Sequence, residues 1–149
     1  MGRALIVSAG ASSNEYIAAR LTEMGYSRPV IIPSGAEARR RMTESDFELI
    51  VVNSPLPDEF GHEVCINAVE KTDAGVVFLV KAAQAEQLLG PLSEQGVLLL
   101  SKPFSTAFFV QAMHMAAAHR YIEKQAMDTR RDRTEIAQEV LENYEDMGV

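Results

Sequence analysis

Five short runs made only of apolar residues, separated by longer segments of helical period, constrain the fold of this 149-residue chain most strongly. A strand that is apolar at every position is typical of a parallel sheet covered on both faces by helices. The alternation of such runs with helical segments indicates repeated βα units. We expect strands at Ala4–Val7, Val30–Ile32, Leu49–Val52, Val76–Val80 and Val97–Leu100. The sequence therefore predicts an α/β protein with (βα)5 architecture, in which helices wind over both faces of a five-stranded parallel sheet.

Two helix starts carry the pattern of a capping box, in which a hydroxyl group and a glutamate three residues later satisfy the first N–H groups of a helix. The pairs are Ser12 with Glu15 and Ser34 with Glu37. Two further helices are expected at His62–Lys71 and Ala83–Glu94, and Pro91 should disturb the last turn of the second. The run Arg39-Arg40-Arg41 is interpreted as a solvated helix face.

The last helix is expected to begin after Pro103, and neither Gly nor Pro interrupts the sequence from Ser105 to Met147. Its middle is dominated by charged residues, and Asp132 is a possible start of a separate helix. Beyond it a narrow apolar stripe at helical spacing contains Ile136, Val140 and Tyr144. We expect residues 1–121 to form the main domain and residues 122–149 a helical extension, in which the stripe pairs two chains as a coiled coil or packs on its own domain.

The composition argues against several classes of protein. The net charge of −7 lacks the basic footprint of a nucleic-acid-binding surface. The longest apolar runs fall far short of the roughly 20 residues of a membrane span, and no secretory signal is evident. With Cys65 as the single cysteine, we expect a cytoplasmic protein with no membrane partner. The spacing of His62, His114 and His119 is unlike that of a metal site, so no metal is expected.

Polar residues gather where the predicted strands end, which is where doubly wound sheets carry their functional sites. The strand ends read Ser8-Ala9, Asn53, Val80-Lys81 and Ser101-Lys102-Pro103-Phe104. Over roughly residues 3–118 this layout resembles the receiver domain of two-component response regulators. The most specific matching pieces are the Lys102-Pro103-Phe104 triplet and the string from Asp46 through Asn53-Ser54-Pro55 to Gly61. The resemblance implies a flavodoxin-like fold and a role in signalling.

By this resemblance, a working receiver has an acidic pair after the first strand, a phospho-accepting Asp ending the third, a Thr or Ser ending the fourth, and the Lys of Lys-Pro. The carboxylates bind Mg²⁺ and one attacks a phosphoryl group, while the metal and the lysine neutralise the growing charge. Here the matching positions are Ser8 and Ala9, Asn53, and Val80, and of the set only Lys102 is retained. An amide is a far poorer nucleophile than a carboxylate. We therefore expect a degenerate pseudo-receiver that has lost its phosphorylation site and is not an enzyme.

Without the acids, the cleft at the strand ends contains two lysines. Lys81 is expected one residue past the fourth strand, and Lys102 two residues past the fifth. The nearest acids in sequence that could pair with them are Asp58 and Glu59. One interpretation is a structural cluster in which Lys102 hydrogen-bonds Asn53 and a loop carbonyl. The other is an anion-binding pocket at Lys81 and Lys102, assisted by the backbone N–H groups of residues 10–13.

A narrower resemblance links the chain to the receivers of ANTAR-type antitermination regulators. It rests on the string from Asn53 to Gly61, on Val80-Lys81-Ala82, on Leu100-Ser101-Lys102-Pro103-Phe104, and on the long helix that follows. In that family a coiled-coil linker leads to a module that binds RNA hairpins. Because the chain stops about where that module would begin, and its last residues are acidic, we do not expect direct nucleic-acid binding.

The sequence as a whole favours a non-catalytic regulatory module that acts through protein–protein contact, as a homodimer or with another regulatory protein. The alternative is a protein that binds a small ligand, an anion or a flavin in the cleft at the strand ends. The segment Ser8–Asn14 has the small, hydroxyl-rich character of a flavin phosphate loop. However, nearby loops offer only Phe60 to stack on a flavin ring, so no cofactor is expected.

Overall fold

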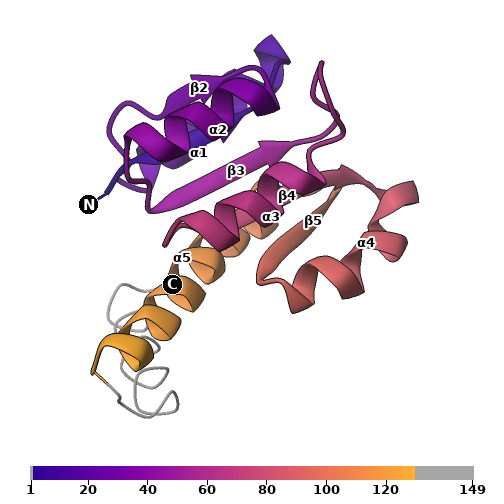
Figure 1. Ribbon diagram of the computed structural model, residues 1–149. Helices are drawn as coiled ribbons and strands as arrows, with labels where there is room; N and C mark the ends of the chain where they lie inside the picture. The colour runs from indigo at the N-terminus through magenta and orange to yellow at the C-terminus, as the bar shows by residue number, and fades with distance from the viewer. Residues whose placement is uncertain (1, 130–149) are drawn as a thin grey trace.

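A computed structural model describes residues 2–129 and contains one five-stranded parallel sheet with the order β2-β1-β3-β4-β5 (Figure 1). The strands are β1 Ala4–Val7, β2 Val30–Ile32, β3 Leu49–Asn53, β4 Gly75–Lys81 and β5 Val97–Lys102. The helices are α1 Ala11–Glu23, α2 Gly35–Glu44, α3 His62–Lys71, α4 Ala82–Glu94 and α5 Thr106–Thr129. The predicted α/β, flavodoxin-like (βα)5 sheet with a long C-terminal helix is confirmed.

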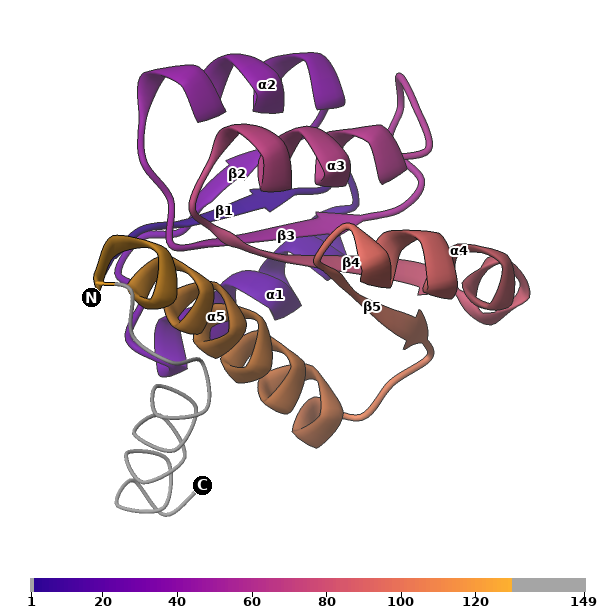
Figure 2. The same ribbon diagram turned by 60° about the horizontal axis from the view of Figure 1, so that its bottom comes forward.

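Helices cover both faces of the sheet and create two hydrophobic cores (Figure 2). One core lies between the sheet and α2, α3 and α4, with Phe78 among its fully buried side chains. The other lies between the sheet and α1 and α5, and it includes Phe109. Because successive strand residues point to opposite faces, one strand supplies both cores, and β1 is buried at every position. The all-apolar runs in the sequence are explained by this double coverage.

The two predicted capping boxes have different outcomes. Ser34 is the N-cap of α2, and its hydroxyl accepts a hydrogen bond from the Glu37 N–H at 3.3 Å, which confirms the serine half of the predicted capping box. The prediction for Ser12 is wrong, because α1 already begins at Ala11 and Gly10 takes the cap position without a side-chain hydrogen bond. The Gly10 carbonyl accepts the first helical bond from Asn14 at 2.8 Å. Ser12 therefore lies inside the first turn, where its hydroxyl is no longer placed to cap the helix.

The arginine run on α2 is not wholly solvated, which corrects the interpretation made from sequence. The Arg39 guanidinium donates to both carboxylate oxygens of Glu59, at 2.6 and 3.0 Å, and to Asn67 Oδ1 at 2.8 Å. These contacts join α2 to the β3–α3 loop and to α3. The sequence pattern missed them because charged runs on helices are usually exposed, and only the packing of α2 beside α3 brings the partners together.

Strands β3, β4 and β5 all extend past the predicted ends. Lys81 is the last residue of β4 and Lys102 the last residue of β5, so both lie on strands and not beyond them. Pro91 does not end α4, which continues to Glu94. No helix within residues 2–129 combines the length and the apolar character needed to cross a membrane.

Helix α5 approaches the start of β4 so closely that only glycine fits there. A Cβ atom on Gly75 would lie 2.5 Å from the backbone oxygen of Ala116. Nearby, Arg120 Nη2 donates to the Thr72 carbonyl at 2.6 Å and fixes α5 to the α3–β4 loop. The helix is continuous across positions 121 and 122, where we expect the main domain to pass into the extension. Asp132, Ile136, Val140 and Tyr144 lie outside the described residues.

We predict different effects for two Gly→Ala substitutions. Gly75→Ala should lower the free energy of unfolding by about 1–3 kcal/mol, because the added methyl meets backbone that cannot rotate away. Gly90→Ala, inside α4 and directly before Pro91, should change it by no more than about 0.5 kcal/mol, because the gain in helix propensity is offset by crowding between the new Cβ and the proline ring. Equilibrium urea denaturation of both variants would measure this. An unchanged midpoint for Gly75→Ala would contradict the close packing of α5 on β4.

Candidate functional site

The carboxyl ends of β3, β4 and β5 bring together three residues singled out from the sequence: Asn53, Lys81 and Lys102. The alternation of side chains along each strand places them on the same face as Leu79 and Leu100, whose side chains pack in the α1 and α5 core. Lys81 and Lys102 are direct register partners in the β4–β5 pair. Their two ammonium groups therefore lie on neighbouring strands at the same edge of the sheet.

Lys102 is the centre of a hydrogen-bond network at this edge. Its Nζ donates to Asn53 Oδ1 at 2.9 Å and to the Ser54 carbonyl at 2.7 Å. The Asn53 side-chain oxygen accepts from the Lys102 ammonium group, so the Asn53 amide nitrogen is directed toward β1. There Asn53 Nδ2 donates to Ser8 Oγ at 3.1 Å. These bonds confirm the interpretation that Lys102 contacts Asn53 and a loop carbonyl. Burial lowers the pKa of the Lys102 ammonium, and the positive charge of Lys81 lowers it further.

The other residues of the predicted site are not equally close to this network. Ser8 is buried and takes part in it, whereas Ala9 is exposed in the β1–α1 loop. Val80 is fully buried in the core on the opposite face of the sheet, so the structure does not bring it to the site. Lys81 is the β4 residue on the site face. Pro103 is exposed and borders a cavity beside the two lysines.

The expectation that Asp58 and Glu59 pair with the lysines is wrong. Asp58 accepts hydrogen bonds from the backbone N–H groups of Gly35, at 3.0 Å, and Ala36, at 3.1 Å, at the start of α2. These bonds lower the pKa of the Asp58 carboxyl group. The Asp58 carboxylate is bound at the positive, N-terminal end of α2. The Glu59 carboxylate is bound by Arg39 of the same helix, so neither acid pairs with Lys81 or Lys102.

Two shallow cavities adjoin Lys102 and Phe104, which line both of them, and Lys81 lines the second. The first, of about 260 Å³, is lined by Ser12, Ser13, Tyr16, Ile17, Asn53, Leu79, Lys102 and Phe104. The second, of about 540 Å³, is lined by Lys81, Lys102, Pro103 and Phe104. The backbone of residues 10–13, expected near an anion, belongs to the start of α1, and Ser12 and Ser13 reach the first cavity.

Tyr16 and Phe104 form an aromatic wall that the sequence analysis did not single out as part of the site. Their ring centroids are 6.4 Å apart, and Phe104 stacks on Phe109 with centroids 5.4 Å apart. The Tyr16 hydroxyl and Thr106 Oγ1 are 2.7 Å apart and share a hydrogen bond. Position 16 lies one helical turn after Ser12, so a helical projection of α1 would have shown that both share a face.

No model of a protein family and no curated protein matches this chain. Solved structures do match. One match is the receiver domain of a sensor histidine kinase from Pseudomonas aeruginosa, which is described with a magnesium ion in its active site cleft. It is 22% identical to this chain, with a TM-score of 0.64, and the match covers 78% of this chain and 97% of that domain. The beryllofluoride-activated NtrC4 receiver domain dimer is 25% identical with a TM-score of 0.71, covering 80% and 99%. This chain has the receiver-domain fold.

A response regulator receiver protein from Sinorhizobium medicae supports the same assignment, at 21% identity and a TM-score of 0.68 over 80% of this chain and 96% of its own. These matches cover 78% and 80% of this chain, which is more than the residues before Thr106, so residues near the start of α5 belong to the matched fold. The Lys102 network lies at the edge of the sheet at which the sequence resemblance placed the receiver site.

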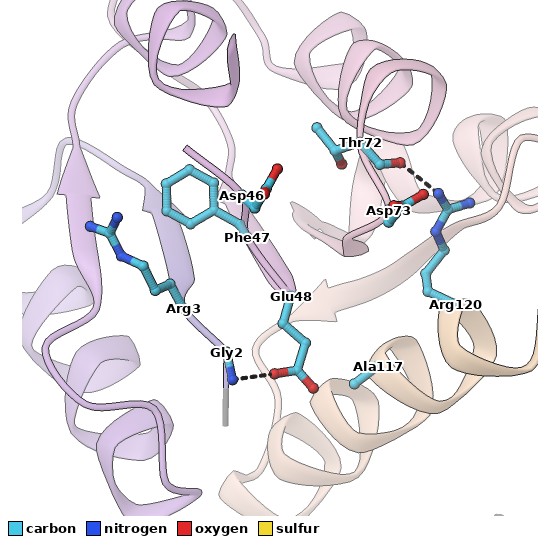
Figure 3. Close-up of a pocket in the computed structure, with 9 residues that line it drawn as sticks. All are labelled: Gly2, Arg3, Asp46, Phe47, Glu48, Thr72, Asp73, Ala117 and Arg120. Carbon is cyan, nitrogen blue, oxygen red and sulfur yellow. Dashed lines mark hydrogen bonds between the residues drawn. The ribbon is translucent and has the colours of Figure 1, made fainter. Parts of the chain in front are cut away.

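A separate cavity of about 390 Å³ lies at the opposite, amino end of the receiver fold (Figure 3). Acids and arginines line it together: Glu48 accepts from the Gly2 N–H at 2.8 Å, and the Arg3 guanidinium lies over the Phe47 ring. Arg120 enters from α5 and binds the Thr72 carbonyl. With both signs of charge present, this cavity has no evident preference for one class of ligand. One of its lining residues, Arg120, attaches α5 to the loop that leads into β4.

No group of three or more His, Cys, Asp or Glu side chains that could hold a metal ion occurs within residues 2–129. His62 lies against the ring of Phe60, with centroids 5.9 Å apart. Burial lowers the pKa of His114, which lies on α5. Neither histidine is among the residues that line the cavities beside the lysines.

We predict that the two lysines of the site contribute unequally to stability. Lys102→Met should lower the free energy of unfolding by about 1–2 kcal/mol, because Asn53 Oδ1 and the Ser54 carbonyl lose their donor in a partly buried position. Lys81→Met should change it by no more than about 0.5 kcal/mol, since Lys81 is exposed. Urea denaturation of the matched pair would test this. Equal losses for both variants would contradict a structural role specific to Lys102.

Proposed function

We propose that this chain is a non-catalytic, receiver-like signalling module that carries no phosphoryl group and acts through protein–protein contact and dimerisation. One observation carries the proposal: an amide, Asn53, ends β3, and its oxygen is held by the Lys102 ammonium at 2.9 Å. The resemblance to receivers assigns this position to the phospho-accepting aspartate. The amide keeps the lysine contact of that carboxylate and lacks its nucleophilic charge.

The surroundings of Asn53 support the same conclusion. A receiver's phosphoryl transfer requires a divalent cation, and hard cations such as Mg²⁺ are bound by carboxylate oxygens. Here Ser8 supplies only a hydroxyl, which already accepts from Asn53, and Ala9 supplies no ligand at all. Two lysines at the same edge would repel a cation further. The site therefore has the opposite sign of charge from one that binds Mg²⁺.

Helix α5 offers a route from the site to a binding partner. Phe104, directly after Lys102-Pro103, stacks on Phe109 of α5. Tyr16 contacts both rings and shares a hydrogen bond with Thr106 at the start of α5. A change at the strand ends would thus reach α5 through direct packing. This supports signalling by contact.

Two apolar features support dimerisation as part of the proposal. Leu89 on α4 and Phe108 and Met115 on α5 are large hydrophobic side chains that are more than half exposed. A groove of about 240 Å³ between the end of α4, β5 and α5 includes Met115. In the extension, outside the described residues, the stripe of Ile136, Val140 and Tyr144 is expected to pair two chains. One structurally similar receiver domain is described as a dimer.

The finer relationship to ANTAR-type antitermination regulators belongs to this proposal as well. It is supported by the Asn53–Gly61 string, the Lys102-Pro103-Phe104 triplet and the length of α5. A second candidate function, binding of a small anion at the strand ends, is favoured by the two neighbouring lysines.

The phosphorylation part of the proposal can be tested with acetyl phosphate and Mg²⁺. We expect intact-mass spectrometry to show no gain of a phosphoryl group on the full chain, because neither a nucleophilic carboxylate nor a metal site is available at Asn53. A receiver domain with its acceptor aspartate, treated in the same tube, is the positive control. A stable, Mg²⁺-dependent mass gain on this chain would refute the loss of phosphorylation.

Dimerisation can be tested by light scattering after size-exclusion chromatography. We expect the full chain to be a dimer, and the double substitution Ile136→Glu, Val140→Glu to give monomers, because two charges would be buried in an apolar seam. The substitution Gln138→Glu adds a charge on the side of the expected helix opposite the stripe and should leave the dimer intact. If the first variant is still a dimer, the interface lies on the exposed face of α4 and α5 and not in the stripe. A monomeric full chain would contradict dimerisation.

A further inference from the structure

We propose that the cleft beside Lys81 and Lys102 binds a small organic anion, with a phosphate or carboxylate head between the two ammonium groups and a flat apolar body against Phe104 and Tyr16. This inference rests on the proposed function, because the cleft is open to a ligand only when Asn53 carries no phosphoryl group. It adds a class of input signal to that proposal, in place of phosphoryl transfer.

The positive charge of the cleft has no compensating acid in the part of the chain that the structure describes. The ion pairs within the described residues join Arg20 to Glu23 and Arg39 to Glu59. Neither of them includes Lys81 or Lys102. Lys81 and Lys102 are register partners on adjacent parallel strands, and the charge of Lys81 acts unfavourably on the Lys102 ammonium. A bound anion would turn this repulsion into two attractions.

Donors for an anion remain at the site. An ammonium group has three N–H donors, and Lys102 uses two of them, on Asn53 Oδ1 and the Ser54 carbonyl. Lys81 is exposed at the end of β4. Ser12 and Ser13 line the adjoining cavity from the first turn of α1, which contains no acidic residue. The positive end of this helix adds to the preference for negative charge.

The dimensions and the apolar wall indicate the class of ligand. The two cavities meet at Lys102 and Phe104 and are shallow and open to solvent, so they suit an anionic head and one flat ring at the surface and do not enclose a larger ligand. Phe104 stacks on Phe109 and lines both cavities, so its position is held by packing while part of the ring remains accessible. A flat apolar group attached to the anionic head would cover this ring and gain more than an inorganic ion.

Such a ligand would also act on α5. Tyr16 lines the cavity and shares a hydrogen bond with Thr106, the first residue of α5. A ligand that orders Tyr16 and Phe104 would order the start of the helix that leads to the extension. The cleft would then control the contacts made by α5.

The test is a titration of the ¹⁵N-labelled full chain with phenyl phosphate, followed by two-dimensional NMR, with parallel titrations of inorganic phosphate and phenol. We expect saturable shifts at residues around Asn53, Lys81 and Lys102, with phenyl phosphate binding more tightly than either of the other two. Lys81→Met should weaken binding about 10-fold or more, because a charge-assisted contact is lost. Lys71→Met, which removes an exposed lysine at the end of α3, should leave it unchanged.

The aromatic wall is tested separately with Phe104→Leu. This variant should bind phenyl phosphate several-fold more weakly, while its affinity for inorganic phosphate stays unchanged. Absence of saturable shifts at about 10 mM phenyl phosphate, or equal loss in the Lys71 and Lys81 variants, would overturn the inference. Failure here leaves the phosphodonor and light-scattering results unaffected, so it is distinguishable from failure of the proposed function.

Discussion

The requirement that both faces of the parallel sheet be covered shapes the rest of this structure. The central strands β1, β3 and β4 are buried along almost their whole length, and their side chains supply two cores at once. Polar and charged side chains are excluded from these positions because burial without partners is costly. They appear only where the strands end, so the chemistry of the molecule is concentrated at one edge of the sheet. Lys102, Asn53 and Ser8 meet there.

At that edge, the residue at position 53 changes the charge of the site without changing its hydrogen bond to Lys102. A carboxylate there would neutralise Lys102, whereas the amide of Asn53 binds Lys102 without neutralising it. The hydrogen bonds stay satisfied and the network keeps its structural role. The charge is left positive, and the presence of Lys81 on the neighbouring strand increases it. Stability therefore depends on the hydrogen bonds of these residues, whereas the proposed anion binding depends on their charge.

Helix α5 connects this edge with the opposite end of the fold. At its start it packs through Phe109 on Phe104 and Tyr16, and farther along it approaches β4 so closely that Gly75 has no room for a side chain. The bond from Arg120 to the Thr72 carbonyl holds it at the base of the sheet. These contacts fix the helix to the sheet at several points along its length.

The sequence by itself determined the strands, the helix order and the placement of Asn53, Lys81 and Lys102 at strand ends, because periodicity and apolar runs are local signals that burial imposes on the chain. It misassigned the cap of α1 by Ser12, the partners of Asp58 and Glu59, and the exposure of Arg39. The partners of Asp58, Glu59 and Arg39 lie 20 or more positions away in the sequence, as in the pair Arg39 and Glu59. The cap of α1 is a local feature that changes because the helix begins one residue before Ser12. Only the tertiary structure showed that β4 extends to Lys81, which directs Lys81 toward the site and Val80 into the opposite core. It also placed Tyr16 and Phe104 together beside Lys102, since the end of each strand and the packing of α1 against α5 are decided by neighbouring elements.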